Sequence, residues 1–222
     1  MKKNLVLLGV ALLLVLTACG GGDKAVTTTE PAANDGEITK VIIGVSPAPH
    51  GEIVEGLDEE FKNAGIEVEI VTFDDYVQPN LALDDGDLDL NYFQHQPYLD
   101  SFIEEHGVDL VTIGQVHVEP LALYSDKYES IDELPEGAEI IIPSDPTNGA
   151  RALLLLQSAG LIELSDPTNL AATEADITAN PKNLVFTAID PANIARTYSD
   201  VDGGVINANF AIDAGLNPME DG

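Results

Sequence analysis

The chain has 222 residues and a formal net charge of −30, from 39 acidic and 9 basic side chains. This charge disfavours binding to nucleic-acid phosphates and to anionic lipid surfaces, so we expect neither as a partner. The acidic residues are dispersed along the sequence rather than gathered in a tail, which is typical of a solvated acidic surface. Cys19 is the only cysteine, which excludes a disulfide within the chain.

The N-terminus has the features of a bacterial lipoprotein signal peptide. Lys2 and Lys3 precede an apolar run over residues 5–16, which is too short to span a bilayer and suits the core of a signal peptide. Small residues before Cys19 resemble a lipobox, at which the chain is cut before the cysteine and its sulfur and new amino group are acylated. We therefore expect residues 1–18 to be removed and Cys19 to be lipidated, which would hold the protein at the extracytoplasmic face of the cell membrane. The alternative is an ordinary signal peptide with an incidental cysteine.

Residues 20–36, GGGDKAVTTTEPAANDG, are small and polar and show no hydrophobic periodicity. A segment of this composition cannot bury enough apolar surface to offset the entropy of ordering it. We therefore predict a flexible tether over residues 19–36, and we expect the folded part to begin near Glu37.

In the first half of the folded part, short β-branched runs alternate with amphipathic helical patterns. Val54, Leu57 and Phe61 recur at helical spacing before Gly65, a residue that typically ends a helix. We expect strands over residues 38–45, 66–73, 88–92 and 109–116, and helices over residues 49–64, 77–85 and 94–106.

The second half shows the same alternation without repeating the sequence. Ser130 and Glu133 fit a capping box at a helix start. Strands that alternate with helices favour a parallel or mixed sheet with helices on both faces, so we predict an α/β fold in two lobes. The expected strands are residues 119–124, 138–142, 183–188 and 204–207, and the expected helices are residues 151–162 and 191–198.

A loop rich in Pro, Asp, Thr and Asn leads into the leucine-rich helix. Thr147 or Asn148 is the expected N-cap, which would place Arg151 in the first helical turn. A cation is disfavoured there, because the N-terminus of a helix already carries partial positive charge. A bound carboxylate or phosphate would resolve this conflict, and so would a salt bridge to one of the many acidic side chains. The residues alone do not decide between these two interpretations.

Aromatic residues are concentrated in the stretch NYFQHQPYLD, residues 91–100. Phe93, His95 and Tyr98 are expected at a strand end and in the following helix, where α/β folds bind ligands, and Tyr76 in the matching preceding loop. Rings with polar tips could hold an apolar side chain, and a thioether gains from contact with aromatic rings. The alternative is that one or two of these rings belong to the core.

Catalytic and metal-binding patterns are weak. The motifs G-x-S-x-G and H-E-x-x-H are absent, and no nucleophile and base stand at a recognisable spacing, so we expect neither an enzyme nor a cofactor. The four histidines do not share an i, i+4 spacing and have no cysteine to assist them. We therefore do not expect a metal site, although exported metal receptors assemble sites from residues distant in sequence. These histidines are His50, His95, His106 and His117.

Five stretches in order along the chain resemble the NlpA/MetQ family of methionine-binding lipoproteins. They are PHGEI, DYVQPN, GDLDLNYFQHQPYLD, IPSDPTNGARALLLLQSAGLI and VINANFAIDAGL. The resemblance implies a two-lobed periplasmic-binding-protein fold that closes on L-methionine, or in some members on D-methionine or short methionine peptides. It also implies a monomeric receptor that delivers its ligand to the permease and ATPase of an ABC importer.

The resemblance assigns roles to the residues singled out above. Tyr76, Phe93, His95 and Tyr98 match the first-lobe side of the ligand pocket, and their rings would surround the thioether. The two second-lobe residues are Arg151, which matches the arginine that holds the ligand carboxylate, and Asn207, which matches an asparagine that hydrogen-bonds the amino-acid backbone. The alternatives that remain are a receptor for another small amino acid or dipeptide, and a receptor for a metal cation.

The resemblance also suggests domain boundaries. Lobe one is expected over residues 37–118 and lobe two over residues 119–214. Residues 215–222 would begin a C-terminal segment that returns to lobe one, because family members continue beyond this point.

Two glycines depart from the family pattern. The family usually has an alanine where Gly51 stands. It also has a glycine directly before the arginine, whereas Gly149 stands one position earlier and Ala150 precedes Arg151.

Overall fold

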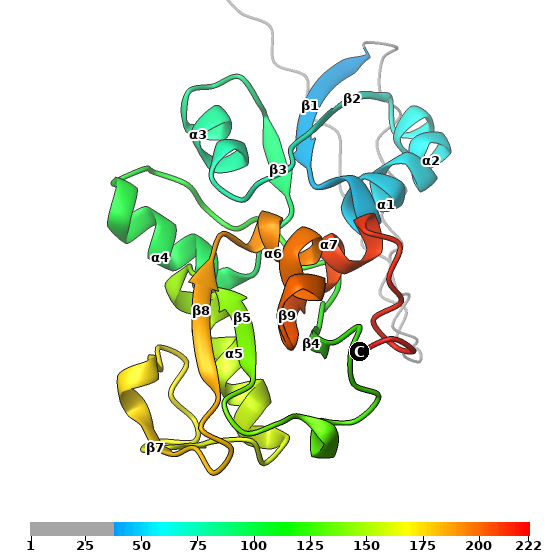
Figure 1. Cartoon of the computed structure of the whole chain (residues 1–222). Coiled ribbons are helices and arrows are strands. Elements are labelled where there is room, and N and C mark those ends of the chain that lie inside the picture. The colour runs from blue at the N-terminus through cyan, green and yellow to red at the C-terminus, as the bar shows by residue number, and fades with distance from the viewer. Residues whose placement is uncertain (1–37) are drawn as a thin grey trace, which may run out of the picture. The chain divides into compact units, whose positions relative to one another are not determined.

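The computed structural model describes residues 38–222, which contain two larger β-sheets, a small two-stranded sheet and the helices that pack on them (Figure 1). The predicted signal peptide, Cys19 and the tether lie outside the described residues. None of the helices within residues 38–222 combines the length and the apolar character needed to cross a membrane.

The first sheet is small and parallel, with the strand order β2-β1-β3. In register, Ile43 of β1 pairs with Ile70 of β2 and with Leu90 of β3. Parallel neighbours require crossover connections, and helices supply them here. The strands are β1 (Thr39–Val45), β2 (Ile66–Thr72) and β3 (Leu90–Tyr92), and the helices are α1 (Glu52–Gly56), α2 (Asp58–Asn63), α3 (Gln78–Asp84) and α4 (Gln96–His106), with a helical turn η1 (Pro47–Gly51) before α1.

The second sheet is mixed, with the strand order β4-β9-β5-β8, and β4 runs antiparallel to β9. Figure 1 shows α5 and α6 beside this sheet. The strands are β4 (Leu121–Tyr124), β5 (Glu139–Pro143), β8 (Val185–Ile189) and β9 (Gly203–Asn207), and the helices are α5 (Pro146–Ser158), α6 (Pro191–Thr197) and α7 (Ala208–Asp213). A two-stranded sheet of β6 (Glu163–Leu164) and β7 (Ile177–Ala179) and the turns η2 (Ile131–Glu133), η3 (Glu174–Asp176) and η4 (Tyr198–Asp200) complete the described part.

The core of the second sheet follows from the alternation of side chains along β5. Ile140 and Ile142 belong to the cluster that contains Leu153 of α5, whereas Ile141 belongs to the cluster with Ile194 of α6. Successive residues of a strand point to opposite faces of the sheet. A strand made only of apolar residues therefore needs helices packed on both faces. Burying a side chain of this size contributes about 1.5–3 kcal/mol. The two clusters around this sheet contain most of the buried residues of the four described clusters, so this sheet holds the larger share of the core.

The connection from the first sheet to the second contains the main departure from the sequence prediction. The expected strand over residues 109–116 is wrong, because residues 107–120 form neither helix nor strand. A strand needs a neighbour for its backbone hydrogen bonds, and within residues 38–222 none pairs with this segment. Four of its apolar side chains are exposed, at 65–93 % for Val111, Ile113, Val116 and Val118, whereas Val108 is buried.

Two local predictions also need correction. The helix expected over residues 49–64 is divided into η1, α1 and α2, because Leu57 leaves helical geometry at φ −102° and ψ 12°. The capping box is wrong in its partners. The Ser130 hydroxyl accepts from the backbone N–H of Asp132, and the Glu133 carboxylate accepts from that of Glu129. The turn that follows is only three residues long, so the N–H that a full box would use is not in place.

Candidate ligand-binding site between the two sheets

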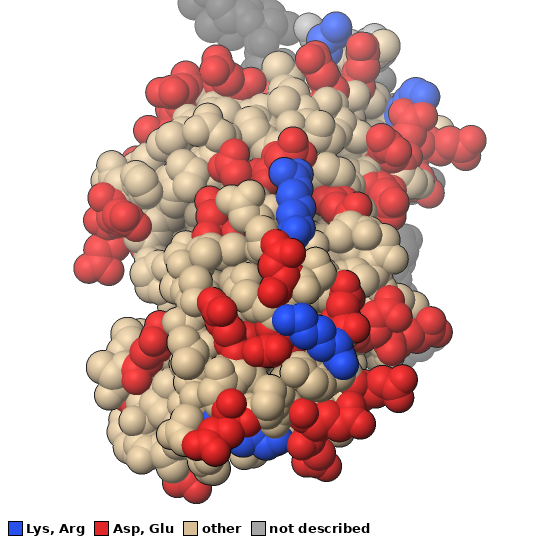
Figure 2. All heavy atoms as spheres, in the orientation of Figure 1, with Lys and Arg blue, Asp and Glu red and all other residues tan. Residues whose placement is uncertain are grey.

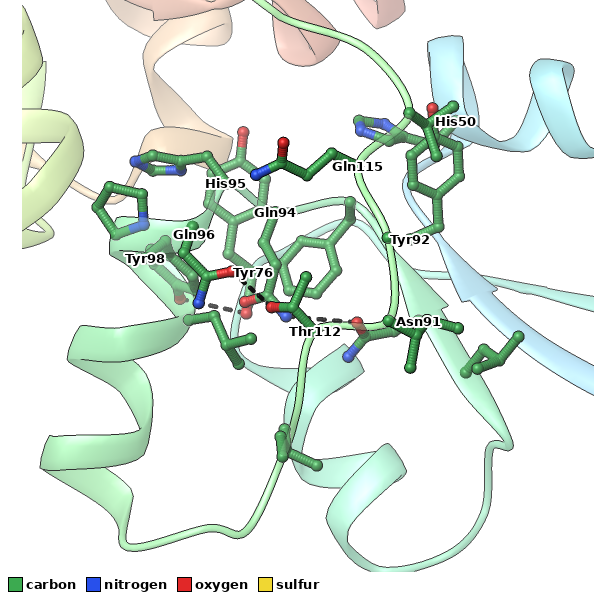
Figure 3. Close-up of a pocket in the computed structure, with 18 of the residues that line it drawn as sticks. His50, Tyr76, Asn91, Tyr92, Gln94, His95, Gln96, Tyr98, Thr112 and Gln115 are labelled. Carbon is green, nitrogen blue, oxygen red and sulfur yellow. Dashed lines mark hydrogen bonds between the residues drawn. The ribbon is translucent and has the colours of Figure 1, made fainter.

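A cavity of about 830 Å³ is lined by residues of both sheet regions and of the segment that connects them. This volume is in the range of ordinary small-molecule sites. Figure 3 shows the part of its wall that β3, α4 and the connecting segment form. All six residues predicted from sequence line this one cavity: Tyr76, Phe93, His95, Tyr98, Arg151 and Asn207.

The rings at one end of the cavity pack against each other. The centroid of Tyr76 lies 5.7 Å from that of Tyr98, 5.8 Å from that of Phe93 and 4.9 Å from that of Phe210. Phe93 and Tyr98 are also buried in a small core cluster. Phe93 and Tyr98 therefore fit both interpretations, as core residues and as pocket residues, because each packs in the core and also lines the cavity.

Hydrogen bonds fix the two tyrosines of this ring cluster. The Tyr98 hydroxyl donates to the backbone oxygen of Tyr76 at 3.2 Å. The Tyr76 hydroxyl donates to Asn209 Oδ1 at 2.5 Å, which joins the first sheet region to α7. Burial raises the pKa of both hydroxyls well above the ordinary tyrosine value, so both stay protonated donors at neutral pH.

His95 is the N-terminal cap position of α4 and is a neutral imidazole in this environment. Burial, followed by the positive charge of Arg151, lowers its pKa to about 4. Its Nε2 atom is buried and has no hydrogen-bond partner among the described residues. A buried polar atom without a partner is costly, and here it borders a cavity that could supply one.

An amide network behind the rings holds the loop between β3 and α4. Asn80 is fully buried, and its Oδ1 accepts from Asn91 Nδ2 at 2.8 Å and from Gln94 Nε2 at 2.7 Å. Gln94 Oε1 in turn accepts from Asn80 Nδ2 at 2.9 Å. This network fixes the backbone on both sides of Phe93. Sequence reasoning missed Asn80, and the only available signal was the glutamine beside His95.

The opposite wall is built by the start of α5, where the predicted cap is wrong. Asp145, rather than Thr147 or Asn148, is the N-cap, and its side chain accepts from the backbone N–H of Asn148. Pro146 occupies the first helical position, which it favours because that position needs no intrahelical N–H. Arg151 therefore lies in the second turn, one turn later than predicted, where the conflict with the helix dipole is weaker.

Asn148 connects the polar residues of this wall. Its Nδ2 donates to both carboxylate oxygens of Asp145, and its Oδ1 accepts from Arg151 Nη1 at 3.0 Å and from Asn207 Nδ2 at 3.1 Å. The residue is 1 % exposed. Sequence analysis considered Asn148 only as a helix cap and missed this role.

The guanidinium of Arg151 has no carboxylate partner. Within residues 38–222 no salt bridge involves Arg151, and its second hydrogen bond runs from Nη2 to the backbone oxygen of Glu119 at 2.8 Å. Burial lowers its pKa, which measures the cost of placing this charge away from water. The side chain of Asn207 presents a further unsatisfied atom, since its buried Oδ1 has no partner among the described residues.

A second polar group lies elsewhere on the cavity wall. Glu119 Oε1 is 3.0 Å from His117 Nε2 and 3.7 Å from His50 Nε2. Burial and the neighbouring His117 lower the pKa of His50 to about 4, and burial raises the pKa of Glu119. Figure 3 shows His50 beside Tyr92, with their ring centroids 4.7 Å apart. The spacing of these residues in the sequence gave no reason to expect them together.

The chain matches the family model described as NlpA lipoprotein over residues 41–222. It is 46 % identical over 220 residues to outer membrane lipoprotein 1 of Mannheimia haemolytica, covering 97 % of this chain and 79 % of that protein. It is 41 % identical over 223 residues to the probable D-methionine-binding lipoprotein MetQ of Vibrio cholerae, covering 100 % and 78 %.

Solved structures share the fold. A nutrient-binding protein from Burkholderia cenocepacia bound to methionine superimposes with a TM-score of 0.77 at 43 % identity, covering 82 % of this chain and 77 % of that one. A lipoprotein from Ruminococcus gnavus gives a TM-score of 0.80 at 43 % identity, covering 82 % and 75 %. The predicted fold class and the predicted resemblance are confirmed. The chain belongs to the NlpA lipoprotein family.

Proposed function

We propose that this protein is a membrane-anchored extracytoplasmic receptor that captures methionine and delivers it to an ABC importer. The observation that carries the proposal is the arrangement of one cavity: a partly buried guanidinium, which forms no salt bridge within residues 38–222, lines it together with a cluster of aromatic rings. The relative solved with bound methionine, at 43 % identity, supports the same ligand class.

Each group of the cavity suits one part of a methionine zwitterion. Arg151 would hold the carboxylate, since a guanidinium binds carboxylates with charge-assisted hydrogen bonds. The free Oδ1 of Asn207 could accept from the ligand ammonium group. Tyr76, Phe93 and Tyr98 would surround the thioether, which gains from sulfur–aromatic contact.

Capture would occur by closure of two lobes, residues 37–118 and residues 119–214, around the ligand. A ligand that contacts both lobes favours the closed state by its differential affinity for it. We place the anchor on Cys19, outside the described residues, and propose that the receptor is a monomer without enzymatic activity. The permease and ATPase of the importer are its proposed partners.

The proposal is tested by calorimetric titration of L-methionine into the wild type and into Arg151→Ala. Charged hydrogen bonds contribute about 1.5–3 kcal/mol, so the variant should bind roughly 10- to 150-fold more weakly. Arg196→Ala is the matched control, because Arg196 is an exposed arginine of α6 away from the cavity.

Ligand analogues separate the two ends of the site. L-Methioninol, which lacks the carboxylate, should bind the wild type weakly, and norleucine, which lacks the sulfur, should bind somewhat less tightly than methionine. D-Methionine, glycyl-methionine and other small amino acids test the alternative ligands. Equal binding of methionine and methioninol, or unchanged affinity of Arg151→Ala, would refute the assigned role of the guanidinium.

A further inference from the structure

We propose that His50, His117 and Glu119 form a binding site for a divalent transition-metal ion of the Zn²⁺ type. One ligand atom from each residue can be chosen so that all lie within 4.8 Å of one another. Around a zinc ion, with bonds of about 2.0–2.2 Å, ligand atoms lie roughly 3.3 Å apart. The observed separations of 3.0 and 3.7 Å from Glu119 Oε1 are close to this spacing, and the remaining pair of ligand atoms lies within 4.8 Å.

The chemistry of the donors favours a borderline ion over a hard one. Two imidazoles and one carboxylate are a common zinc set, whereas Ca²⁺ and Mg²⁺ prefer six or more oxygen ligands. This distinction matters in a chain with 39 acidic residues, because surface carboxylates bind hard cations without selectivity. An ion that prefers imidazole ligands would therefore bind at this cluster rather than at the surface carboxylates.

The position of His50 indicates a preformed ligand rather than a surface histidine. His50 is 2 % exposed and lies on η1 against the rings of Tyr92 and His117, whose centroids lie 4.7 and 5.0 Å away. His117 and Glu119 are partly exposed, with 26 % and 21 % of their side chains accessible, so an ion could enter from that side.

The groups behind the cluster orient two of its three ligands. The Tyr92 hydroxyl hydrogen-bonds His117 Nδ1, which leaves Nε2 of the same ring directed at Glu119. Metal-bound histidines usually make such a bond through their second nitrogen. The backbone oxygen of Glu119 accepts from Arg151 Nη2, which fixes the residue that carries the carboxylate.

A bound ion would join two segments that are distant in sequence. His50 belongs to η1, and His117 and Glu119 belong to the connecting segment, residues 107–120. Three protein ligands leave a fourth coordination position, which a water molecule could fill. Occupancy would therefore attach the connecting segment to the first sheet region and raise the unfolding temperature.

The test is a Zn²⁺ titration of metal-stripped protein in millimolar Mg²⁺, without methionine, read by calorimetry and thermal unfolding. We expect one ion per chain at micromolar or tighter affinity, and a higher unfolding temperature. His117→Ala should weaken Zn²⁺ binding at least 100-fold, and Tyr92→Phe roughly 10- to 100-fold. His106→Ala is the matched control, because His106 is exposed on α4 and stacks only on Phe102.

Co²⁺ substitution supplies a readout that a merely structural role would not produce. The ion bound at this cluster should give visible absorption bands of nitrogen-ligated Co²⁺, and these bands should be lost in His117→Ala. If that variant unfolds, Glu119→Gln replaces it, because it keeps the side-chain shape and removes the anionic ligand. Equal Zn²⁺ affinity of wild type and variant, or displacement of Zn²⁺ by Mg²⁺, would overturn the proposal. Methionine binding measured in the presence of a chelator is independent of this result.

Discussion

Two walls of the same cavity are stabilised in different ways. The wall at the start of α5 is a buried network, in which Asn148 binds Asp145, Arg151 and Asn207. The other wall is the connecting segment, residues 107–120, in which Thr112 hydrogen-bonds Gln96 and four of the valine and isoleucine side chains are exposed. Arg151 and Asn207 thus lie on the wall that this network fixes, whereas His117 and Glu119 lie on the connecting segment.

The difference between these walls has a physical cause in the backbone. A helix satisfies its hydrogen bonds within one segment, so the leucine-rich pattern of α5 needs only a surface to pack on. A strand needs a partner for its N–H and C=O groups as well as for its side chains. The strand predicted over residues 109–116 remains irregular because no described strand lies beside it.

The largest effect is expected at the centre of the fixed wall. Asn148→Ala removes the shared partner of the Arg151 and Asn207 side chains and of the Asp145 carboxylate, and each unsatisfied group costs about 1–3 kcal/mol. We expect a loss of about 2–4 kcal/mol in the free energy of unfolding, measured by urea denaturation. Asn193→Ala, at an exposed position of α6, should stay within about 0.5 kcal/mol of the wild type. A loss below 1 kcal/mol at Asn148 would show that the network does not stabilise this wall.

The next effect concerns the close approach of α5 to β5. A Cβ atom on Gly149 would lie 2.9 Å from the backbone oxygen of Pro143, which cannot move as a flexible side chain does. Gly149→Ala should therefore destabilise the protein by about 1–3 kcal/mol in the same denaturation experiment.

The second departure from the family pattern serves as the control for Gly149. A Cβ on Gly51 would meet Val45 Cγ2 at 3.4 Å and the Ser46 oxygen at 3.5 Å, which are ordinary contacts. Gly51→Ala should thus be neutral or stabilising by about 0.4–1 kcal/mol, because alanine restricts the unfolded chain. Equal effects at the two glycines would contradict the packing explanation.

The family resemblance predicted all six cavity residues, and α/β topology explains why they meet, because it brings strand ends together. Phe93 and His95 follow β3, Arg151 follows β5 in α5, and Asn207 ends β9. The hydrogen-bond partners of these side chains were harder to predict, because a shift of the helix start changes which side chains meet. Asn148 can bond Asp145, Arg151 and Asn207 because the helix begins after Asp145, earlier than the predicted caps Thr147 and Asn148 would allow.

Proximity across the connecting segment could not be predicted at all. The pairing of His117 and Glu119 with His50 depends on the path of residues 107–120, and that path differs from the predicted strand. The predicted strands, residues 109–116 and 119–124, did not include His117, and they did not indicate which element Glu119 would meet.

A smaller, pH-dependent effect is expected at His95. Its pKa is about 4 in the folded state and near 6.5 when unfolded, so the unfolded chain binds the proton between these values. Its contribution to stability is therefore fully present above pH 6.5 and is lost as the pH falls toward 4. We expect the free energy of unfolding of the wild type, relative to that of His95→Gln, to decrease as the pH falls from 6.5 toward 4. Urea denaturation at several pH values measures this. A difference that is constant with pH would exclude a neutral buried imidazole at this position.

The smallest effect is expected on the connecting segment, where one substitution can be compared at two sites. Val118 is 93 % exposed and Val205 is fully buried in β9. Val→Thr keeps the side-chain shape and adds a hydroxyl, which costs about 1–3 kcal/mol when it is buried without a partner. Val205→Thr should therefore lower the free energy of unfolding by about that amount, whereas Val118→Thr should change it by less than 0.5 kcal/mol. If Val118→Thr cost as much as Val205→Thr, the segment would be packed in solution, and the contrast between the two walls would fail.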